Sequence, residues 1–178
     1  MASPAIAFAQ LANECEAEGL TPKNAEHIGL EIAKTFQLQA DEVGILRLDK
    51  QNLVFVYPMK LHNVGSIPLN TTGSVAARTA TSKRGEVINN FAQTKHTSIF
   101  EAVELDNKPK AVVGEKHEHV PHQIQKLMSV PVVGPAGVLG VIQTSHKGTS
   151  APTAGPDFTP MDLQKLNMIA TALAKCFK

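Results

Sequence analysis

The chain has 178 residues, of which 43% are hydrophobic and 19% are charged, a composition typical of a globular protein rather than a disordered one. Its 17 basic and 16 acidic residues leave a formal net charge of +1, which gives no positive field for binding nucleic acid or an anionic membrane. No apolar run approaches the roughly 18 residues that span a bilayer, and the N-terminus lacks the basic residues of a secretory signal. Two cysteines are too few for a disulfide framework, so we expect a cytoplasmic protein. From the charge and the apolar runs, we expect neither a nucleic-acid nor a membrane partner.

Two helices are predicted before residue 40. The first begins at Ser3, with Pro4 at a helical position where its missing N–H is tolerated, and it stops at Gly19. The second begins at Thr21 and is followed by an apolar stripe at helical spacing. The stripe consists of Ala25, Ile28, Ile32 and Phe36.

The middle of the chain alternates between strand, helix and irregular patterns. Residues 43–48 and 53–57 are β-rich and flank a turn composition, so they predict a hairpin. Residues 58–72 are expected to be irregular, residues 74–81 to form a helix of small residues, and residues 86–89 to form a short strand.

The C-terminal third again shows clear patterns. Residues 127–133 and 138–144 flank Gly134-Pro-Ala-Gly137 and predict a second hairpin, after which residues 148–156 are expected to be a flexible loop. The last helix begins at Thr159, and Asp162 is placed to complete a capping box. An apolar seam then repeats at helical spacing, and it fits packing either on a sheet or on another helix. Its members are Leu163, Leu166, Ala170, Leu173 and Phe177.

Antiparallel hairpins between terminal helices indicate an α+β fold rather than a doubly wound parallel sheet. We expect a single domain over residues 1–178, with a helical N-terminal extension over residues 1–20 and a core over residues 22–177.

Three segments together resemble the GAF domain family. They are the helix and hairpin that end at residues 53–57, the small-residue helix with its glycine turn at 73–89, and residues 128–143 running into 158–162. The resemblance implies a central antiparallel sheet with the N- and C-terminal helices on one face. Pocket-covering loops and short helices occupy the other face, which here corresponds to residues 61–69 and 90–125. It also implies a small-molecule ligand, as family members hold cyclic nucleotides, tetrapyrroles, haem, amino acids or metabolites.

Some nucleotide-binding members carry Asn-Lys, then Phe, three residues, and Asp-Glu. The corresponding residues here are His146 and Lys147, Phe158, and Asp162 with Leu163, so that the Lys, Phe and Asp match. We assign the matching residues structural roles. Lys147 and Asp162 are expected to form an ion pair that closes the intervening loop, with Phe158 anchoring that loop in the core.

Cysteine chemistry is not expected in this chain. Some stand-alone GAF proteins reduce free methionine sulfoxide, and they use several cysteines in the pocket loops. In this chain, residues 58–125 contain no cysteine. The same absence excludes attachment of a bilin through a pocket cysteine. No nucleophile elbow, metalloprotease motif or phosphate loop occurs either, so we expect a protein without catalytic residues.

A histidine-rich segment offers the second reading of the sequence. His117, His119 and His122 lie within six residues beside Glu115 and Glu118, and imidazole with carboxylate suits zinc or a similar ion. The spacing matches no established zinc pattern, so a solvated polar loop is the favoured interpretation of this segment. A metal- or haem-binding protein, or an enzyme, built on these histidines is therefore the alternative function.

The expected ligand-binding residues are those that the resemblance places in the pocket wall. They are Asn90, Phe91, His96, Phe100 and His122. Polar members supply directed hydrogen bonds and the two phenylalanines an apolar wall, although both also fit as simple core anchors. The favoured function is a non-catalytic sensor or regulatory domain in signalling, acting as a homodimer through its terminal helices and the seam at 163–177. A scaffold with a filled pocket is a third reading, and the sequence specifies neither a ligand nor a cofactor.

Overall fold

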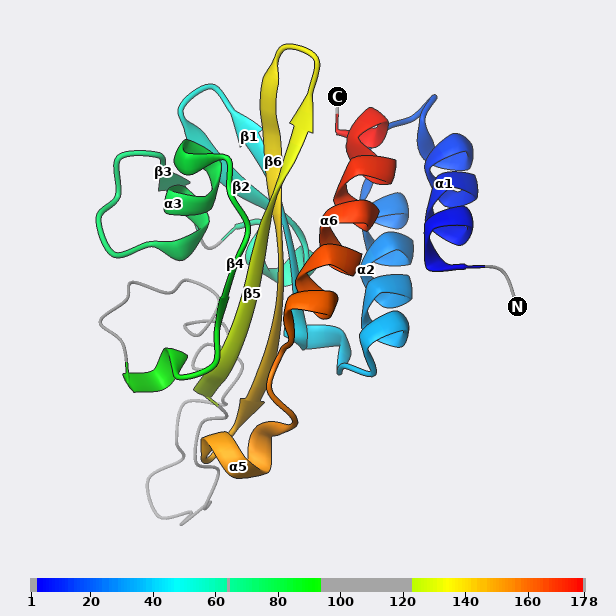
Figure 1. Ribbon diagram of the computed structural model, residues 1–178. Coiled ribbons are helices and arrows are strands. Elements are labelled where there is room, and N and C mark those ends of the chain that lie inside the picture. Colours follow the sequence, from blue (N-terminus) through cyan, green and yellow to red (C-terminus); the bar gives the residue numbers. More distant parts are fainter. Residues whose placement is uncertain (1–2, 64, 94–122, 178) are drawn as a thin grey trace, which may run out of the picture.

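The computed structural model describes residues 3–63, 65–93 and 123–177, and these form a six-stranded sheet in the order β3-β2-β1-β6-β5-β4 (Figure 1). Every neighbouring pair of strands is antiparallel. The strands are β1 (Val43–Asp49), β2 (Asn52–Tyr57), β3 (Ser66–Pro68), β4 (Glu86–Ile88), β5 (Gln123–Gly134) and β6 (Gly137–Gly148). The two long strands, β5 and β6, therefore form the centre of the sheet together with β1.

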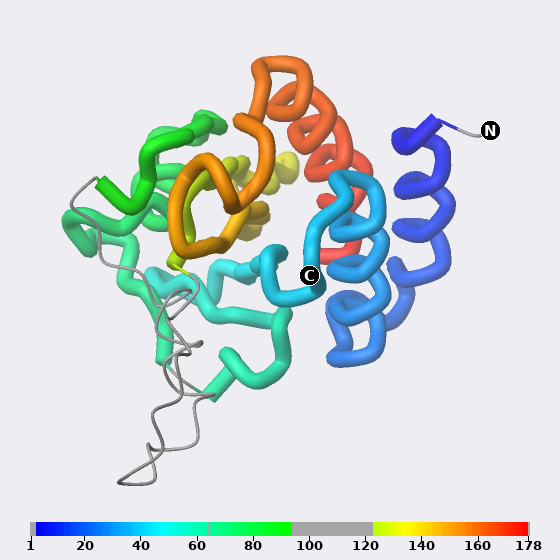
Figure 2. The backbone as a smooth tube through the Cα atoms, turned by 90° about the horizontal axis from the view of Figure 1, so that it is seen from below, coloured from blue at the N-terminus to red at the C-terminus, as the bar shows by residue number. Residues whose placement is uncertain are grey.

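Helices cover both faces of this sheet. They are α1 (Pro4–Cys15), α2 (Pro22–Phe36), α3 (Val75–Ser82), α5 (Ala151–Ala154) and α6 (Pro160–Leu173), with single 3₁₀ turns η1 (Ala40–Glu42), η2 (Met59–Leu61), η3 (Phe91–Gln93) and η4 (Ala174–Cys176). The terminal helices α2 and α6 lie on one face, α1 forms a further layer outside them, and α3 lies on the opposite face (Figures 1 and 2). The predicted α+β fold is confirmed.

Side chains that bond backbone N–H groups fix where the two main helices begin. Thr21 Oγ1 accepts a hydrogen bond from the Asn24 N–H at 3.1 Å. At the start of α6, Thr159 and Asp162 form a capping box. Thr159 Oγ1 accepts from the Asp162 N–H at 3.1 Å, and Asp162 Oδ2 accepts from the Thr159 N–H at 2.9 Å. Each cap satisfies N–H groups that a helix cannot pair internally, and a cap of this kind stabilises by about 1 kcal/mol. Both predicted helix starts are confirmed.

Two apolar clusters lie on the two faces of the sheet. Along β5, Met128 and Val130 face the terminal helices, whereas Leu127 faces α3, as the alternation of a strand requires. The seam of α6 belongs to the first cluster, where Leu166 and Leu173 are fully buried against the sheet and α1. Ala170 and Phe177 are buried as well and Leu163 is partly buried, so the seam packs mainly against the chain's own elements.

Three segments differ from the sequence prediction. The first helix ends at Cys15, and a turn closed by the Gly19 N–H on the Cys15 carbonyl at 2.8 Å follows. The segment expected to be irregular contains β3, whose Ile67 pairs with Leu53 of β2. The loop expected to be flexible contains the single turn of α5.

Candidate functional site

The face of the sheet that carries α3 is built for a close approach between helix and strands. The helix is capped by Ser74, whose Oγ accepts from the Ala77 N–H at 3.2 Å. Small side chains at Ala76, Ala77 and Ala80 are buried, so the helix backbone lies near the sheet. Arg78 turns outward and pairs with Glu86 of β4 at 2.8 Å. Its guanidinium is half-exposed, so this pair contributes little stability.

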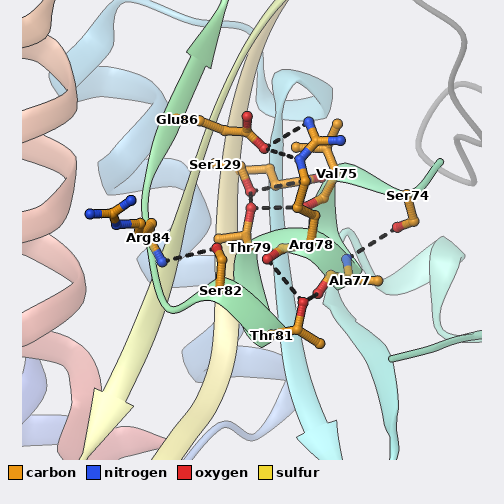
Figure 3. A network of polar contacts seen from close by, with 11 residues as sticks. Ser74, Val75, Ala77, Arg78, Thr79, Thr81, Ser82, Arg84, Glu86 and Ser129 are labelled. Atoms are coloured by element: carbon orange, nitrogen blue, oxygen red, sulfur yellow. Dashed lines mark hydrogen bonds and ion pairs between the residues drawn. The ribbon is translucent and has the colours of Figure 1, made fainter. Parts of the chain in front are cut away.

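A buried polar chain joins α3 to the centre of the sheet (Figure 3). Thr79 Oγ1 donates to the Val75 carbonyl at 2.8 Å. Because the Thr79 proton is used there, the 2.7 Å contact with Ser129 Oγ is a bond that Ser129 donates and Thr79 accepts. Ser129 Oγ in turn accepts from Gln143 Nε2 at 3.2 Å. The chain thus runs in one direction from Gln143 on β6 through Ser129 on β5 to α3.

Gln143 is the end of this chain that retains unused hydrogen-bonding capacity. Its side chain is only 5% exposed, yet no residue in the described part of the chain donates to its Oε1. A primary amide has two N–H donors and a carbonyl acceptor, and only one donor is used on Ser129. Gln143 can therefore offer an adjacent donor and acceptor to a ligand with the complementary pair, such as another amide or the edge of a nucleobase.

The surroundings of this amide are apolar. The buried side chains on this face are Leu46, Leu53, Phe55, Leu61, Ile67, Val75, Phe91, Ile124, Leu127 and Val141. An apolar wall with a few directed polar groups is the usual composition of a small-molecule site.

The predicted pocket residues fall on this face only in part. Phe91 begins η3 and is buried in the apolar cluster under α3, while the neighbouring Asn90 is exposed. His96, Phe100 and His122 lie outside the described residues. The same holds for the proposed metal ligands His117 and His119, and within the described ranges no group of three or more His, Cys, Asp or Glu side chains could hold a metal ion.

Surface grooves lined by described residues also occur on the helix side of the sheet. One lies between α1 and α2, one beside the β5–β6 turn and the end of α6, and one beside His146. The second is mainly apolar, whereas the third is lined by Glu42, Asp41 and Lys147 among others. The α3 face is favoured over these because it presents the amide of the buried residue Gln143, whose carbonyl has no donor in the described part of the chain, beside an apolar cluster.

The residues around His146 form a joint between β6 and the start of α6. The His146 ring stacks on Phe158 with centroids 4.6 Å apart and planes 14° apart. A Cβ added at Gly155, whose φ is +137°, would lie 2.8 Å from His146 Nδ1, so the loop passes directly over the ring. Burial lowers the pKa of His146 and Lys126 lowers it further, while Glu42 and Asp162 raise it.

The ion pair expected between Lys147 and Asp162, across the segment between β6 and α6, is made by other residues. Among the described side chains, the pair joins Lys126 Nζ to Asp157 at 2.8 Å rather than Lys147 to Asp162. Lys126 also donates to the Gly155 carbonyl at 2.6 Å. The Lys147 backbone N–H donates to Glu42 Oε2 at 2.6 Å, and Asp162 is engaged in capping α6. Phe158 is buried at the joint, 5% exposed.

With this geometry established, comparison with known proteins decides the family. The sequence profile of the GAF domain matches residues 30–177. The chain belongs to the GAF domain family. No curated protein sequence gives a match.

Solved structures support the same GAF fold. The GAF domain of a phosphoenolpyruvate-protein phosphotransferase from Acinetobacter is 12% identical with a TM-score of 0.63, over 99% of this chain and 94% of that one. The nlh2 GAF domain of A. aeolicus in an inactive state is 12% identical with a TM-score of 0.62, over 98% and 95%. The reduced form of fRMsr of Staphylococcus aureus is 14% identical with a TM-score of 0.54, over 96% and 95%. In the described part of this GAF chain, no helix is both long and apolar enough to cross a membrane.

Proposed function

We propose that this GAF domain is a non-catalytic sensor that binds a small molecule on the α3 face of its sheet, with the Gln143 amide as the group that selects it. The observation that carries the proposal is the amide of the buried residue Gln143, whose carbonyl meets no donor among the described residues and which lies on the same face as an apolar cluster. The oxygen is not among the fully buried, unpaired side-chain atoms of the described residues, so a ligand that donates to it takes the place of water. The ligand class is therefore a compact molecule with neighbouring hydrogen-bond donor and acceptor atoms.

Hydrogen bonds connect Gln143 to other elements of the fold. The amide is linked through Ser129 to Thr79, so a ligand that reorients it also changes the restraint on α3. On β6, Ile142 next to it faces the terminal helices. We infer that the terminal helices transmit the response, as a homodimer that uses their exposed side chains in place of the buried seam. The cytoplasmic setting of the proposal rests on the two cysteines, which both carry reduced thiols.

Binding is proposed over catalysis because both cysteines lie far from the α3 face. Cys15 is on α1 and Cys176 on η4, and both belong to the cluster under the terminal helices. We expect no turnover when the protein is incubated with free methionine sulfoxide and a dithiol reductant. Turnover would overturn the non-catalytic part of the proposal and leave the binding part to the experiment below.

The test compares two variants that remove a buried amide from the central hairpin. Gln143→Leu removes the amide that is linked through Ser129 to α3, whereas Gln125→Leu removes one whose Nε2 donates instead to the Gly148 carbonyl at 3.0 Å. Native mass spectrometry of each purified protein detects a retained ligand, and thermal-shift titrations with nicotinamide, hypoxanthine and free methionine test the chemical class. We expect the wild type and Gln125→Leu to retain or bind a molecule that Gln143→Leu loses. Equal binding by a folded Gln143→Leu variant would reject the proposed role of the amide.

A further inference from the structure

The C-terminal half of α1 contacts the last turn of the described chain, η4. Lys175 contacts Asn13 and pairs with Glu16 at 3.6 Å. Cys176 Sγ lies 3.5 Å from the Ala12 carbonyl oxygen, to which its S–H donates. The last turn, η4, is therefore held against the C-terminal half of α1.

The second cysteine lies on the same part of α1. Cys15 follows Ala12 by three residues, and both are buried on the face that meets α6 and η4. In a helix, side chains lean back toward the N-terminus, so a side chain at one position lies over the carbonyl of the residue three or four positions earlier. The Cys15 side chain is thus directed toward the carbonyl that Cys176 contacts.

We propose that Cys15 and Cys176 are a disulfide-forming pair that covalently joins the first helix to the end of the last one under oxidising conditions. Both are reduced thiols in this structure, with exposures of 3% and 0%. A disulfide requires the two Cβ atoms to lie about 3.5–4.5 Å apart. Because both thiols are buried, exchange with a dissolved disulfide also requires η4 to separate transiently from α1. The site lies on the helix side of the sheet, opposite the α3 face, and involves none of the residues of the proposed ligand site.

The chemistry is a thiol–disulfide exchange with a small disulfide such as oxidised glutathione. One protein thiolate attacks the glutathione disulfide and releases a glutathione thiolate, which takes up the proton. The other protein thiolate then displaces the second glutathione, so two electrons pass to glutathione and one protein disulfide forms. Burial and the neighbouring Glu14 and Glu18 raise the pKa of the Cys15 thiol. Because the thiolate is the reactive form, we expect the exchange to accelerate as the pH rises.

The consequence is a covalent restraint on the outermost layer of the fold. Helix α1 lies outside α2 and α6 (Figures 1 and 2). A disulfide from Cys15 to Cys176 would enclose most of the chain in one loop. Closing a long loop removes many conformations from the unfolded chain, so the oxidised protein should melt at a higher temperature than the reduced one.

The experiment incubates the full chain with oxidised glutathione at pH 8.5 and measures intact mass, free thiols and Tm. We expect a mass lower by about 2 Da from the loss of two hydrogens, no free thiol, and a Tm increase that dithiothreitol reverses. Peptide mapping should recover the Cys15 and Cys176 peptides joined to each other. Cys15→Ser and Cys176→Ser, which each keep one sulfur, should remain without an internal disulfide and show no Tm increase.

Several outcomes would overturn the proposal. Wild-type protein that stays fully reduced, that carries glutathione on both cysteines, or that forms only disulfide-linked dimers has no competent pair. A wild-type disulfide without the Tm increase would remove the proposed restraint while leaving the pair itself. If a serine variant fails to fold, the corresponding Cys→Ala variant replaces it as the control.

Discussion

The side chain of Asn89 holds the backbone of Phe158 in both directions. Asn89 Nδ2 donates to the Phe158 carbonyl at 3.1 Å, and Asn89 Oδ1 accepts from the Phe158 N–H at 2.9 Å. The side-chain amide thus makes the two hydrogen bonds that a neighbouring strand's backbone would make. It connects the end of β4 to the residues that precede α6. Since Phe158 also stacks on His146, this contact links β4, β6 and α6.

Replacing Asn89 with Ala should lower the free energy of unfolding by about 1–3 kcal/mol, because both hydrogen bonds are lost at a part-buried position. Asn89→Asp is the matched variant, as it keeps the acceptor for the Phe158 N–H and loses only the donor. We expect it to be intermediate in a guanidinium unfolding experiment. An Asn89→Ala protein as stable as the wild type would show that the two bonds contribute nothing.

The parts of the fold that were predicted from the sequence depend on local patterns. Thr159 and Asp162 form their capping box within a single turn, so residue spacing alone identified the start of α6. β3 was missed because it has three residues and only Ile67 is buried, too few to show an alternation. Its place is decided by pairing with β2, which is a contact between distant parts of the chain.

Contacts across the central hairpin could not be predicted for a related reason. Ser129 pairs with Gln143, but a register shift near Val133 separates this pair from the turn. Counting back from the turn without that shift would place Gln143 one residue out and on the wrong face. The same register continues to Lys126 and sets it opposite His146, which decides which lysine reaches the loop before α6.

Thr144 is predicted to destabilise the fold. Its hydroxyl is fully buried on β6 and has no hydrogen-bond partner among the residues that the structure describes. Thr144→Val keeps the shape and removes the unsatisfied group, so it should raise the free energy of unfolding by about 1 kcal/mol. The same substitution at Thr79 should lower it by about 1–3 kcal/mol, because there the hydroxyl bonds both Val75 and Ser129. If Thr144→Val and Thr79→Val changed the free energy of unfolding in the same direction, the proposed difference between the two hydroxyls would be contradicted.

Gly29 is required by the packing of α2 on β2. An added Cβ would lie 2.5 Å from the Tyr57 ring, and the Tyr57 hydroxyl is held by the Ala40 carbonyl at 2.9 Å. Gly→Ala within a helix normally stabilises by about 1 kcal/mol, whereas here we expect a loss of about 1–3 kcal/mol from overpacking. Gly134→Ala is the control, because its Cβ would meet only the flexible end of Leu139. Thermal unfolding of the two variants distinguishes them, and a stabilised Gly29→Ala would refute the packing argument.

Dimerisation is predicted to depend on exposed apolar side chains of the terminal helices. Leu30 on α2 and Met168 on α6 are 46% and 48% exposed. A Leu30→Glu, Met168→Glu double variant should fold and sediment as a monomer, whereas the wild type should sediment as a dimer. Met59→Glu, which changes an equally exposed residue on η2, should leave the dimer intact. A monomeric wild type, or a dimeric double variant, would remove the terminal helices as the interface.

His146 is predicted to make the stability of the fold depend on pH. Burial, reinforced by Lys126, lowers its pKa in the folded protein, with Glu42 and Asp162 acting in the opposite sense. The unfolded chain therefore binds a proton at a higher pH than the folded chain does. The stability that neutral His146 contributes is complete above its ordinary pKa of about 6.5 and is lost as the pH falls through the lowered value.

Replacing His146 with Phe tests this directly, because it keeps a ring that can stack on Phe158 and removes the titrating group. We expect the Tm of the wild type to fall more steeply than that of His146→Phe between about pH 7 and pH 5. His27→Phe, at an exposed position of α2, should keep the wild-type slope. Parallel profiles of Tm against pH for the wild type and His146→Phe would mean that protonation of His146 does not change the stability of the fold.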